Sequence, residues 1–350
     1  MSRPEDYGNS LIWNQKNHFA GNGRVVRDPW IEWWYFKLVL PQSGIPFNFT
    51  YGVINPWDEA GKNPHSHAFV RFGDLAGNRI VEEHFSLSEF ESSYDEMRTK
   101  IGTNLATERR LFGELTSEEG ESFSWDIEVE KRWSFNAMTW SMRFLNLTNI
   151  AWYPAQADAR CSGVIRRGDE TFEFSDVPCY QDRNWGVSLP EWWTWIVSNE
   201  FDGHPESALV VGGGRPTILG VLRRDGVVIG LRHEGRVYSF HPQDGHITRT
   251  NVQFGTWRVS ANNFRHRIEV EAWAPFEQFT DTDFVTPTGA RFHDYATLTG
   301  SVLVRLYERR WRLGRLPDWK LIAELHSSVA GIEYGSPDPQ APFSDDSEIR

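Results

Sequence analysis

A two-residue alternation of side-chain character runs through most of this chain and restricts its fold more than any other feature. In segments 32–40 and 46–55 nearly every second residue is aromatic or aliphatic, and the intervening Pro-Gln-Ser-Gly is typical of a hairpin turn. Similar segments recur as far as residue 334. Convincing amphipathic helices are hard to find, and the best candidate, residues 86–99, is short and polar. Many short strands separated by turn signals predict an all-β fold of barrels or sandwiches.

The chain has 350 residues, more than one small barrel needs, so we expect two antiparallel β-domains packed together. The least strand-like stretch near the middle, 146–159, places the boundary between domains 1–155 and 156–335. Residues 336–350 are rich in Pro, Ser and Asp and are expected to be a disordered tail. Glu32-Trp33-Trp34 and Glu191-Trp192-Trp193 each open an aromatic strand, which reflects either a duplication or a coincidence.

The composition excludes some classes of function and favours an apolar ligand. A net charge of −12 argues against nucleic-acid binding, which needs a basic surface. The 17 Trp and 23 Phe residues exceed what a core needs and indicate an aromatic-lined cavity. No apolar run resembles a signal peptide or a membrane span, and two cysteines imply no disulfide framework. We therefore expect a cytoplasmic protein without an integral membrane segment.

Segment 171–214 holds the strongest candidate site. Asp182, Arg183, Asn184 and Trp185 stand side by side just before an aromatic strand. We interpret them as a loop that joins two strands and could cover the mouth of a barrel, where sites often lie. The alternative is an ordinary ion pair between Asp182 and Arg183 at the surface.

Two predicted strands add polar groups to apolar faces. The odd-numbered residues of 193–201 share one face, so Asn199 must find a partner or line a cavity. Glu32 lies on the face of Trp34 and Phe36. If it points inward, desolvation would raise its pKa and make it a general acid, and otherwise it is a rim carboxylate paired with Arg or Lys.

Other motifs give weaker signals. His65 and His67 could chelate a metal, but no third ligand is obvious, so we predict no metal site. The Gly212-Gly213-Gly214 triplet lacks the context of a phosphate loop and is interpreted as a bulge or turn. Cys179 has no evident activating partner and is interpreted as structural.

Taken together, the motifs resemble the tocopherol cyclase family, within the wider group that includes carotenoid 1,2-hydratases. The resemblance rests on WIEWWYFK at 30–37, on segment 40–56, on YQDRNWG at 180–186 and on W-x-W-x-x-x-N at 193–199. Asp182 stands where the cyclases have Glu, and Arg183 where they have Lys.

The resemblance implies two lipocalin-like β-domains and cofactor-free chemistry on a lipophilic, isoprenoid or polyketide molecule. An alkene is protonated and the cation is trapped within the molecule, as an intramolecular lyase or isomerase would do. Asp182 is expected to be the general acid and Glu32 its partner acid or base, while Arg183, Tyr180 and Asn199 orient polar atoms. The expected substrate-binding residues are Trp34, Tyr35, Asn184, Trp185, Trp193, Trp195 and Asn199.

Three other functions stay open from the sequence. Water could replace the internal nucleophile, as in a hydratase, or the pocket could only fold the substrate for a pericyclic cyclisation. A carrier would bind the lipophile without chemistry. In each case the expected partner is a lipophilic small molecule. Peripheral membrane contact and the oligomeric state are left open.

Overall fold

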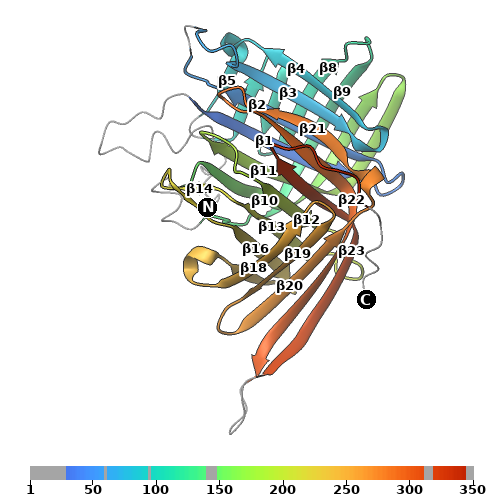
Figure 1. The fold of residues 1–350 in the computed structure, drawn as a ribbon. Coiled ribbons are helices and arrows are strands. Elements are labelled where there is room, and N and C mark those ends of the chain that lie inside the picture. The colour runs from blue at the N-terminus through green and yellow to red at the C-terminus, as the bar shows by residue number, and fades with distance from the viewer. Residues whose placement is uncertain (1–28, 59–60, 94–95, 139–147, 311–317, 344–350) are drawn as a thin grey trace. The chain divides into compact units, whose positions relative to one another are not determined.

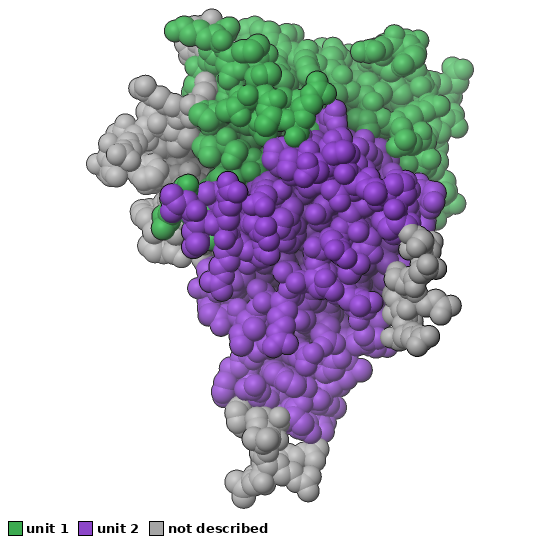
Figure 2. All heavy atoms as spheres, viewed as in Figure 1, with its two compact units in different colours: residues 1–189, 218–220, 284–291 green, residues 190–217, 221–283, 292–350 purple. Residues whose placement is uncertain are grey.

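The computed structural model describes residues 29–58, 61–93, 96–138, 148–310 and 318–343. These residues form two compact units (Figure 2). Unit 1 comprises residues 1–189, 218–220 and 284–291, and unit 2 comprises residues 190–217, 221–283 and 292–350. The division falls between 189 and 190, and the boundary predicted at 155/156 lies inside a long strand, β10 (Ile150–Arg167).

Unit 1 is built on one antiparallel sheet in the order β4-β3-β2-β1-β11-β10-β9-β8-β7-β6-β5 (Figure 1). Besides β10, its strands are β1 (Ile31–Val39), β2 (Pro46–Ile54), β3 (His67–Asp74), β4 (Arg79–Phe85), β5 (Phe90–Ser92), β6 (Arg98–Ile101), β7 (Asn104–Thr107), β8 (Arg110–Thr116), β9 (Ser122–Trp133) and β11 (Glu170–Gly186).

This sheet curls around a single core. The rings of Phe49 on β2 and Phe72 on β3 lie 5.1 and 5.7 Å from that of Trp125 on β9. These strands are far apart in the sheet order, so only a curled sheet can bring their side chains together. The indole N–H of Trp125 also donates to the Tyr51 hydroxyl, at 2.8 Å, which satisfies both polar atoms inside the core.

Unit 2 is built on a second antiparallel sheet in the order β17-β16-β13-β12-β23-β22-β20-β19-β18, with β21 paired to β22. Its strands are β12 (Trp193–Ser198), β13 (Ala208–Gly214), β16 (Gly226–His233), β17 (Arg236–Phe240), β18 (Ile247–Gln253), β19 (Thr256–Asn262), β20 (His266–Trp273), β21 (Thr280–Val285), β22 (Arg291–Arg310) and β23 (Asp318–Ser336). The short β14 (Thr217–Ile218) and β15 (Leu222–Arg223) pair with each other.

The two sheets share one strand topology. In each, the first strand lies between the second and the last: β1 between β2 and β11, and β12 between β13 and β23. The all-β prediction, with two lipocalin-like sheets that each enclose a core, is confirmed. Within the described ranges the helical elements are short 3-10 turns: η2 (Leu75–Gly77), η3 (Leu87–Glu89), η4 (Pro242–Asp244) and η5 (Phe276–Gln278).

The described residues of 86–99, the best helix candidate in the sequence, form a short 3-10 turn and two strands. Ser86 caps only the short turn η3, with a capping box to Glu89. The chain then forms the β5–β6 hairpin, in which Phe90 pairs with Ile101. Thr99 and Ile101 are fully buried on one side of β6, so the period of two prevails over the weak helical pattern.

Three further interpretations also need correction. Residues 180–186 are not a loop but the end of β11, because β1 and β10 pair with them on both sides. Cys161 and Cys179, on the neighbouring strands β10 and β11, form a disulfide. The glycine triplet ends β13, where a side chain at Gly213 would meet the backbone of Gly226 at 2.1 Å.

The expected tail at 336–350 is covered only in part. Residues 344–350 lie outside the described residues. Before them, the Phe343 ring packs against the core of unit 2, 5.1 Å from the ring of Phe254.

Candidate active site

The carboxyl group of Asp182 is held by three hydrogen-bond donors on the sheet of unit 1. Trp152 Nε1 and the Tyr180 hydroxyl donate to Oδ2, at 2.8 and 2.9 Å. Asn184 Nδ2 donates to Oδ1 at 2.9 Å. Asp182 is only 3% exposed, so these contacts replace most of the water that a carboxylate needs. The group is fixed in both position and orientation.

Strand pairing places aromatic side chains beside this acid. Tyr35 on β1 stands opposite Asp182, and Trp33 stands opposite Asn184. Directly opposed residues of an antiparallel pair share a face. Trp33 is mostly buried and Tyr35 is partly exposed, so the row presents an aromatic and polar surface. We name Asp182, Tyr180, Asn184, Trp33 and Tyr35 the Asp182 row.

Glu32 and Arg183 lie on the other face of the same sheet, within the core. The Arg183 guanidinium forms an ion pair with Glu32, with Nε 2.8 Å from Oε1, and neither side chain is exposed. Trp30 Nε1 donates to the second carboxylate oxygen at 3.2 Å. The guanidinium also lies 4.4 Å from the ring centre of Trp185 and 5.8 Å from that of Trp34, as cation–π pairs do.

The candidates from segment 30–37 and those from 180–186 therefore do not form one cluster. Alternation along β11 sends Asp182 and Arg183 to opposite faces. Tyr180, Asn184 and Tyr35 go with Asp182. Glu32, Trp34 and Trp185 go with Arg183 and belong to the core. Although the sequence suggested different domains for Glu32 and Asp182, both lie in unit 1 on adjacent strands.

The remaining candidates, Trp193, Trp195 and Asn199, lie in unit 2. Trp193 and Trp195 are on β12, and Asn199 follows this strand and is nearly buried. Trp193 and Trp195 lie on the face opposite to the core of the unit, which receives Ile196 of the same strand.

Sequence reasoning missed Glu333, which stands opposite Trp195 on β23. Its Oε1 accepts a hydrogen bond from Trp193 Nε1. Burial raises the pKa of this carboxyl group, and hydrogen bonds from Trp193 and with Asp294 offset part of the rise. The sequence did carry one sign of this site. Gly331, Glu333 and Gly335 recur at every second residue and therefore share one face of a strand.

The described residues include one group that could hold a metal ion. The ligand atoms of Asp281, Asp283 and His293 lie within 4.8 Å of one another on β21 and β22. Both carboxylates are exposed, and His293 Nδ1 is already 2.9 Å from Asp281. His65 and His67 do not belong to this group, and the His67 ring instead stacks on that of His84.

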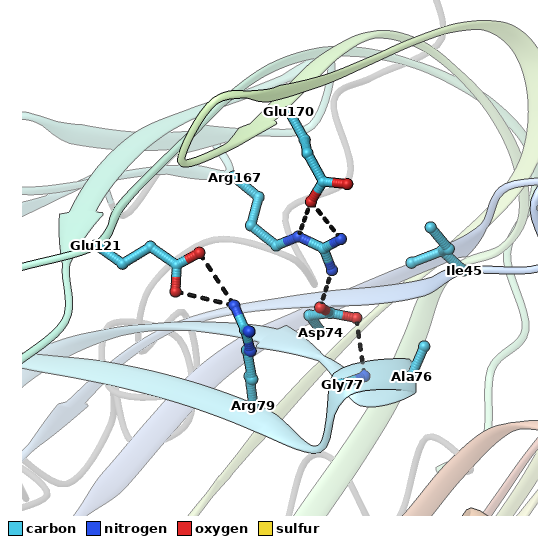
Figure 3. A pocket seen from close by; sticks show the side chains of 8 residues that line it. All are labelled: Ile45, Asp74, Ala76, Gly77, Arg79, Glu121, Arg167 and Glu170. Atoms are coloured by element: carbon cyan, nitrogen blue, oxygen red, sulfur yellow. Dashed lines mark hydrogen bonds and ion pairs between the residues drawn. The ribbon is translucent and has the colours of Figure 1, made fainter. Parts of the chain in front are cut away.

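A hollow of about 410 Å³ in unit 1 does not suit an apolar ligand (Figure 3). Its charged lining is neutralised by ion pairs: Arg79 with Glu121, and Arg167 with Asp74 and Glu170. Such a surface favours water over hydrocarbon. We therefore place the candidate site on the Asp182 row rather than in this hollow.

Comparison with known proteins decides the family. A family model described as tocopherol cyclase-like matches residues 98–336. The chain belongs to the tocopherol cyclase-like family. The match covers β6 to β23 and therefore includes Asp182 and Glu333. This result confirms the family resemblance that the sequence motifs indicated.

Relatives within the family are distant but extend over most of the chain. "Probable tocopherol cyclase, chloroplastic" of Oryza sativa subsp. japonica is 24% identical over 387 residues, which span 91% of this chain and 77% of the relative. "Tocopherol cyclase, chloroplastic" of Zea mays is 24% identical over 372 residues, which span 91% and 76%. Among solved structures, kievitone hydratase from Nectria haematococca aligns with a TM-score of 0.48 and 10% identity, over 87% of this chain and 88% of its own.

No helix within the described ranges has the length and apolar character that a membrane crossing needs.

Proposed function

We propose that this member of the tocopherol cyclase-like family is a cofactor-independent cyclase. It would act on a lipophilic small molecule of isoprenoid or polyketide type, protonating an alkene and closing a ring by internal trapping. The reaction class is an intramolecular lyase or isomerase. The observation that carries the proposal is the nearly buried Asp182 carboxyl group, fixed by three donors beside the aromatic side chains of Trp33 and Tyr35.

Asp182 acts as the general acid in this scheme. Trp152 and Asn184 can only donate from the atoms that face the carboxyl group, whereas the Tyr180 hydroxyl can donate or accept. When Asp182 is protonated, its O–H can therefore donate to Tyr180 without any movement of the heavy atoms. Tyr180 thus lets the same geometry hold both protonation states, as a proton-transferring group requires.

The proton balance closes on the same residue. Asp182 gives its proton to one alkene carbon, and the electron pair of the double bond forms the new C–H bond. A hydroxyl oxygen of the substrate bonds to the resulting cation and releases its own proton to the Asp182 carboxylate. The product has the mass of the substrate. The aromatic faces of Trp33 and Tyr35 stabilise the cation by cation–π attraction.

Glu32 and Arg183 have a different proposed role because they lie on the core face. Their buried ion pair joins β1 to β11 directly behind the Asp182 row. It would keep Tyr35 and Asp182 opposite each other, as positioning residues do. Trp34 and Trp185 contact the guanidinium and would support this pair rather than line the site.

Mass spectrometry of the purified protein with prenylated quinols, carotenoid precursors and linear polyenes tests the proposal. A product of unchanged mass that forms with wild type but not with Asp182→Asn supports it. Asp176→Asn is the matched control, because Asp176 is an exposed acid on the same strand with a positive φ that Asn tolerates.

The other outcomes identify the alternatives. A gain of one water would mean a hydratase, and unchanged mass with an active Asp182→Asn would mean pericyclic cyclisation. Retained but unaltered ligand would mean a carrier. Hydration would contradict internal trapping but leave Asp182 as the acid, whereas the other two results would contradict the acid role of Asp182.

The sequence predicts a cytoplasmic location, and the redox state of the two cysteines can test this prediction. A cytoplasmic protein would keep Cys161 and Cys179 reduced, whereas the structure joins them. Fractionation of the native host followed by thiol labelling would show which state occurs and in which compartment.

A further inference from the structure

Unit 2 repeats on its own sheet the arrangement that holds Asp182 in unit 1. In each sheet the first strand pairs with the last, so Tyr35 on β1 stands opposite Asp182 and Trp195 on β12 stands opposite Glu333. The preceding outward residue of the first strand is Trp33 in one unit and Trp193 in the other. Each carboxyl group also accepts a hydrogen bond from an indole N–H.

The match depends on which face the side chains occupy. Trp33 and Tyr35 alternate with the core residues Trp34 and Phe36, and Trp193 and Trp195 alternate with the core residue Ile196. Both acids therefore project from the face opposite to the core of their own unit. Trp33 therefore corresponds to Trp193 in the structure. Aligning the two Glu-Trp-Trp motifs by sequence would instead match Trp33 with Trp192.

Two glycines shape the surface around Glu333. A Cβ at Gly335 would lie 1.9 to 2.3 Å from three ring atoms of Trp193, and a Cβ at Gly331 would lie 2.3 Å from the Trp195 ring. Each indole thus covers a glycine, and Glu333 stands between them on β23. Only a strand without side chains at both positions lets two indoles lie against its backbone.

The surroundings of Glu333 hold no cation among the contacts that the structure describes. Its partners are the Trp193 indole and the Asp294 carboxyl group, and Ala296 stands opposite on β22. Burial raises the pKa of Glu333 above that of an exposed Glu, and the hydrogen bonds with Trp193 and Asp294 act in the opposite direction. A residue that only accepts the hydrogen bond of Trp193 would not need to be ionisable. The side-chain oxygen of a Gln would accept the same bond without the cost of burying a charge.

We propose that Glu333 is a second proton-donating residue, which protonates an unsaturated apolar ligand lying on the indoles of Trp193 and Trp195. This inference rests on the proposed cyclase function. In the step, the Glu333 proton bonds to one alkene carbon through the π electron pair, and the cation develops over the indole faces. A hydroxyl oxygen of the ligand bonds to the cation and releases its own proton to the Glu333 carboxylate, so the acid is restored and the ligand keeps its mass.

The substrate class follows from this surface. Two indoles beside a single carboxyl group attract a polarisable hydrocarbon with double bonds, such as a prenyl chain, more than a charged or sugar-like molecule. A molecule with several alkenes could be protonated at more than one position.

The test compares Glu333→Gln with Glu324→Gln, an exposed acid on the same strand that pairs with Arg305. Infrared difference spectra between wild type and each variant at neutral pH should show the loss of one protonated carboxyl band in Glu333→Gln and no such loss in Glu324→Gln. Turnover of prenylated quinols in heavy water should place deuterium on carbon, and Glu333→Gln should lose at least about 100-fold of this turnover. Quenching of tryptophan fluorescence by the same quinols should persist in Glu333→Gln, which shows that the surface still binds.

Failure takes distinguishable forms. A Glu333→Gln variant that loses no carboxyl band, or whose turnover is near that of wild type, overturns the inference while the function of Asp182 stands. A wild type that converts none of the panel contradicts the proposed function, and with it the proton transfer assigned to Glu333.

Discussion

Asp182 and Arg183 are consecutive residues of β11, yet their side chains serve opposite faces of one sheet. The acid faces Tyr35 and takes three hydrogen bonds, while the guanidinium is buried in the core against Glu32. Each side chain thus has partners on its own face of the sheet. Separate experiments can therefore measure the chemistry on one face and the stability on the other.

Breaking the buried ion pair should be costly for stability. Glu32→Gln and Arg183→Met should each lower the free energy of unfolding by roughly 3–5 kcal/mol, because each leaves a buried charge without its partner. The double variant should lose less than the sum of the two. Urea denaturation measures all three. Arg110→Met, which breaks an exposed pair with Asp126, should cost under about 1 kcal/mol. Equal and small losses of unfolding free energy at the Glu32–Arg183 and Arg110–Asp126 pairs would contradict a stabilising role for the buried pair.

The Tyr180 hydroxyl should affect turnover more than binding. Tyr180→Phe removes the partner that can both donate to and accept from Asp182, so kcat should fall by roughly 100-fold while KM changes little. Tyr307→Phe removes a similar hydroxyl–carboxylate bond, 2.9 Å to Glu269, on unit 2 and should leave kcat unchanged. A Tyr180→Phe enzyme with normal kcat would show that Asp182 needs no such partner.

Glu82 should make stability depend on acidity. Burial acts to raise the pKa of this carboxyl group, but the Arg71 charge and the His84 contact outweigh it and lower the pKa from 4.5 to about 2. Its contribution is thus complete above about pH 4.5 and is lost as pH falls towards 2. Because water screens its open side, we expect only ~1–2 kcal/mol. Unfolding of wild type and Glu82→Gln should differ at pH 7 and converge near pH 2. A difference in unfolding free energy between the two proteins that does not change with pH would contradict this role of Glu82.

Gly335 should not tolerate even one methyl group. Gly335→Ala would push the Trp193 ring away from β23, at a cost of about 1–3 kcal/mol, and should alter near-UV circular dichroism. Gly226→Ala, whose added carbon meets nothing closer than 3.9 Å, is the control. If the Gly335→Ala spectrum overlays that of wild type, the indole does not lie where we describe it.

The strands of the fold were largely predictable, but the structure of residues 86–99 was not. The predicted strands 32–40 and 46–55 differ by one residue from β1 and β2, because alternation and the turn between them agree. The prediction at 86–99 relied on a short polar pattern without tertiary information. Pairing of β5 with β6 decided the structure there.

The candidate site was predictable in composition but not in arrangement. The unusual residue types around Asp182 singled out the right segment. Pro178 and the run of polar residues hid the strand, since proline is rare inside sheets. With the strand unrecognised, nothing in the sequence showed that Asp182 and Arg183 point apart. Glu333 was missed because its partners, Trp193 and Asp294, are distant in sequence.

The two faces of β11 carry different functions, which limits the mutations that this strand can accept. A substitution on one face leaves the other face intact, so residues around Asp182 can vary without disturbing the pair behind them. Insertion or deletion of one residue in β11 is different, because it exchanges the two faces from that point onward. The arginine would then leave the core and the acid would enter it. Changes of length in this family should therefore accumulate in the connections between strands rather than within β11.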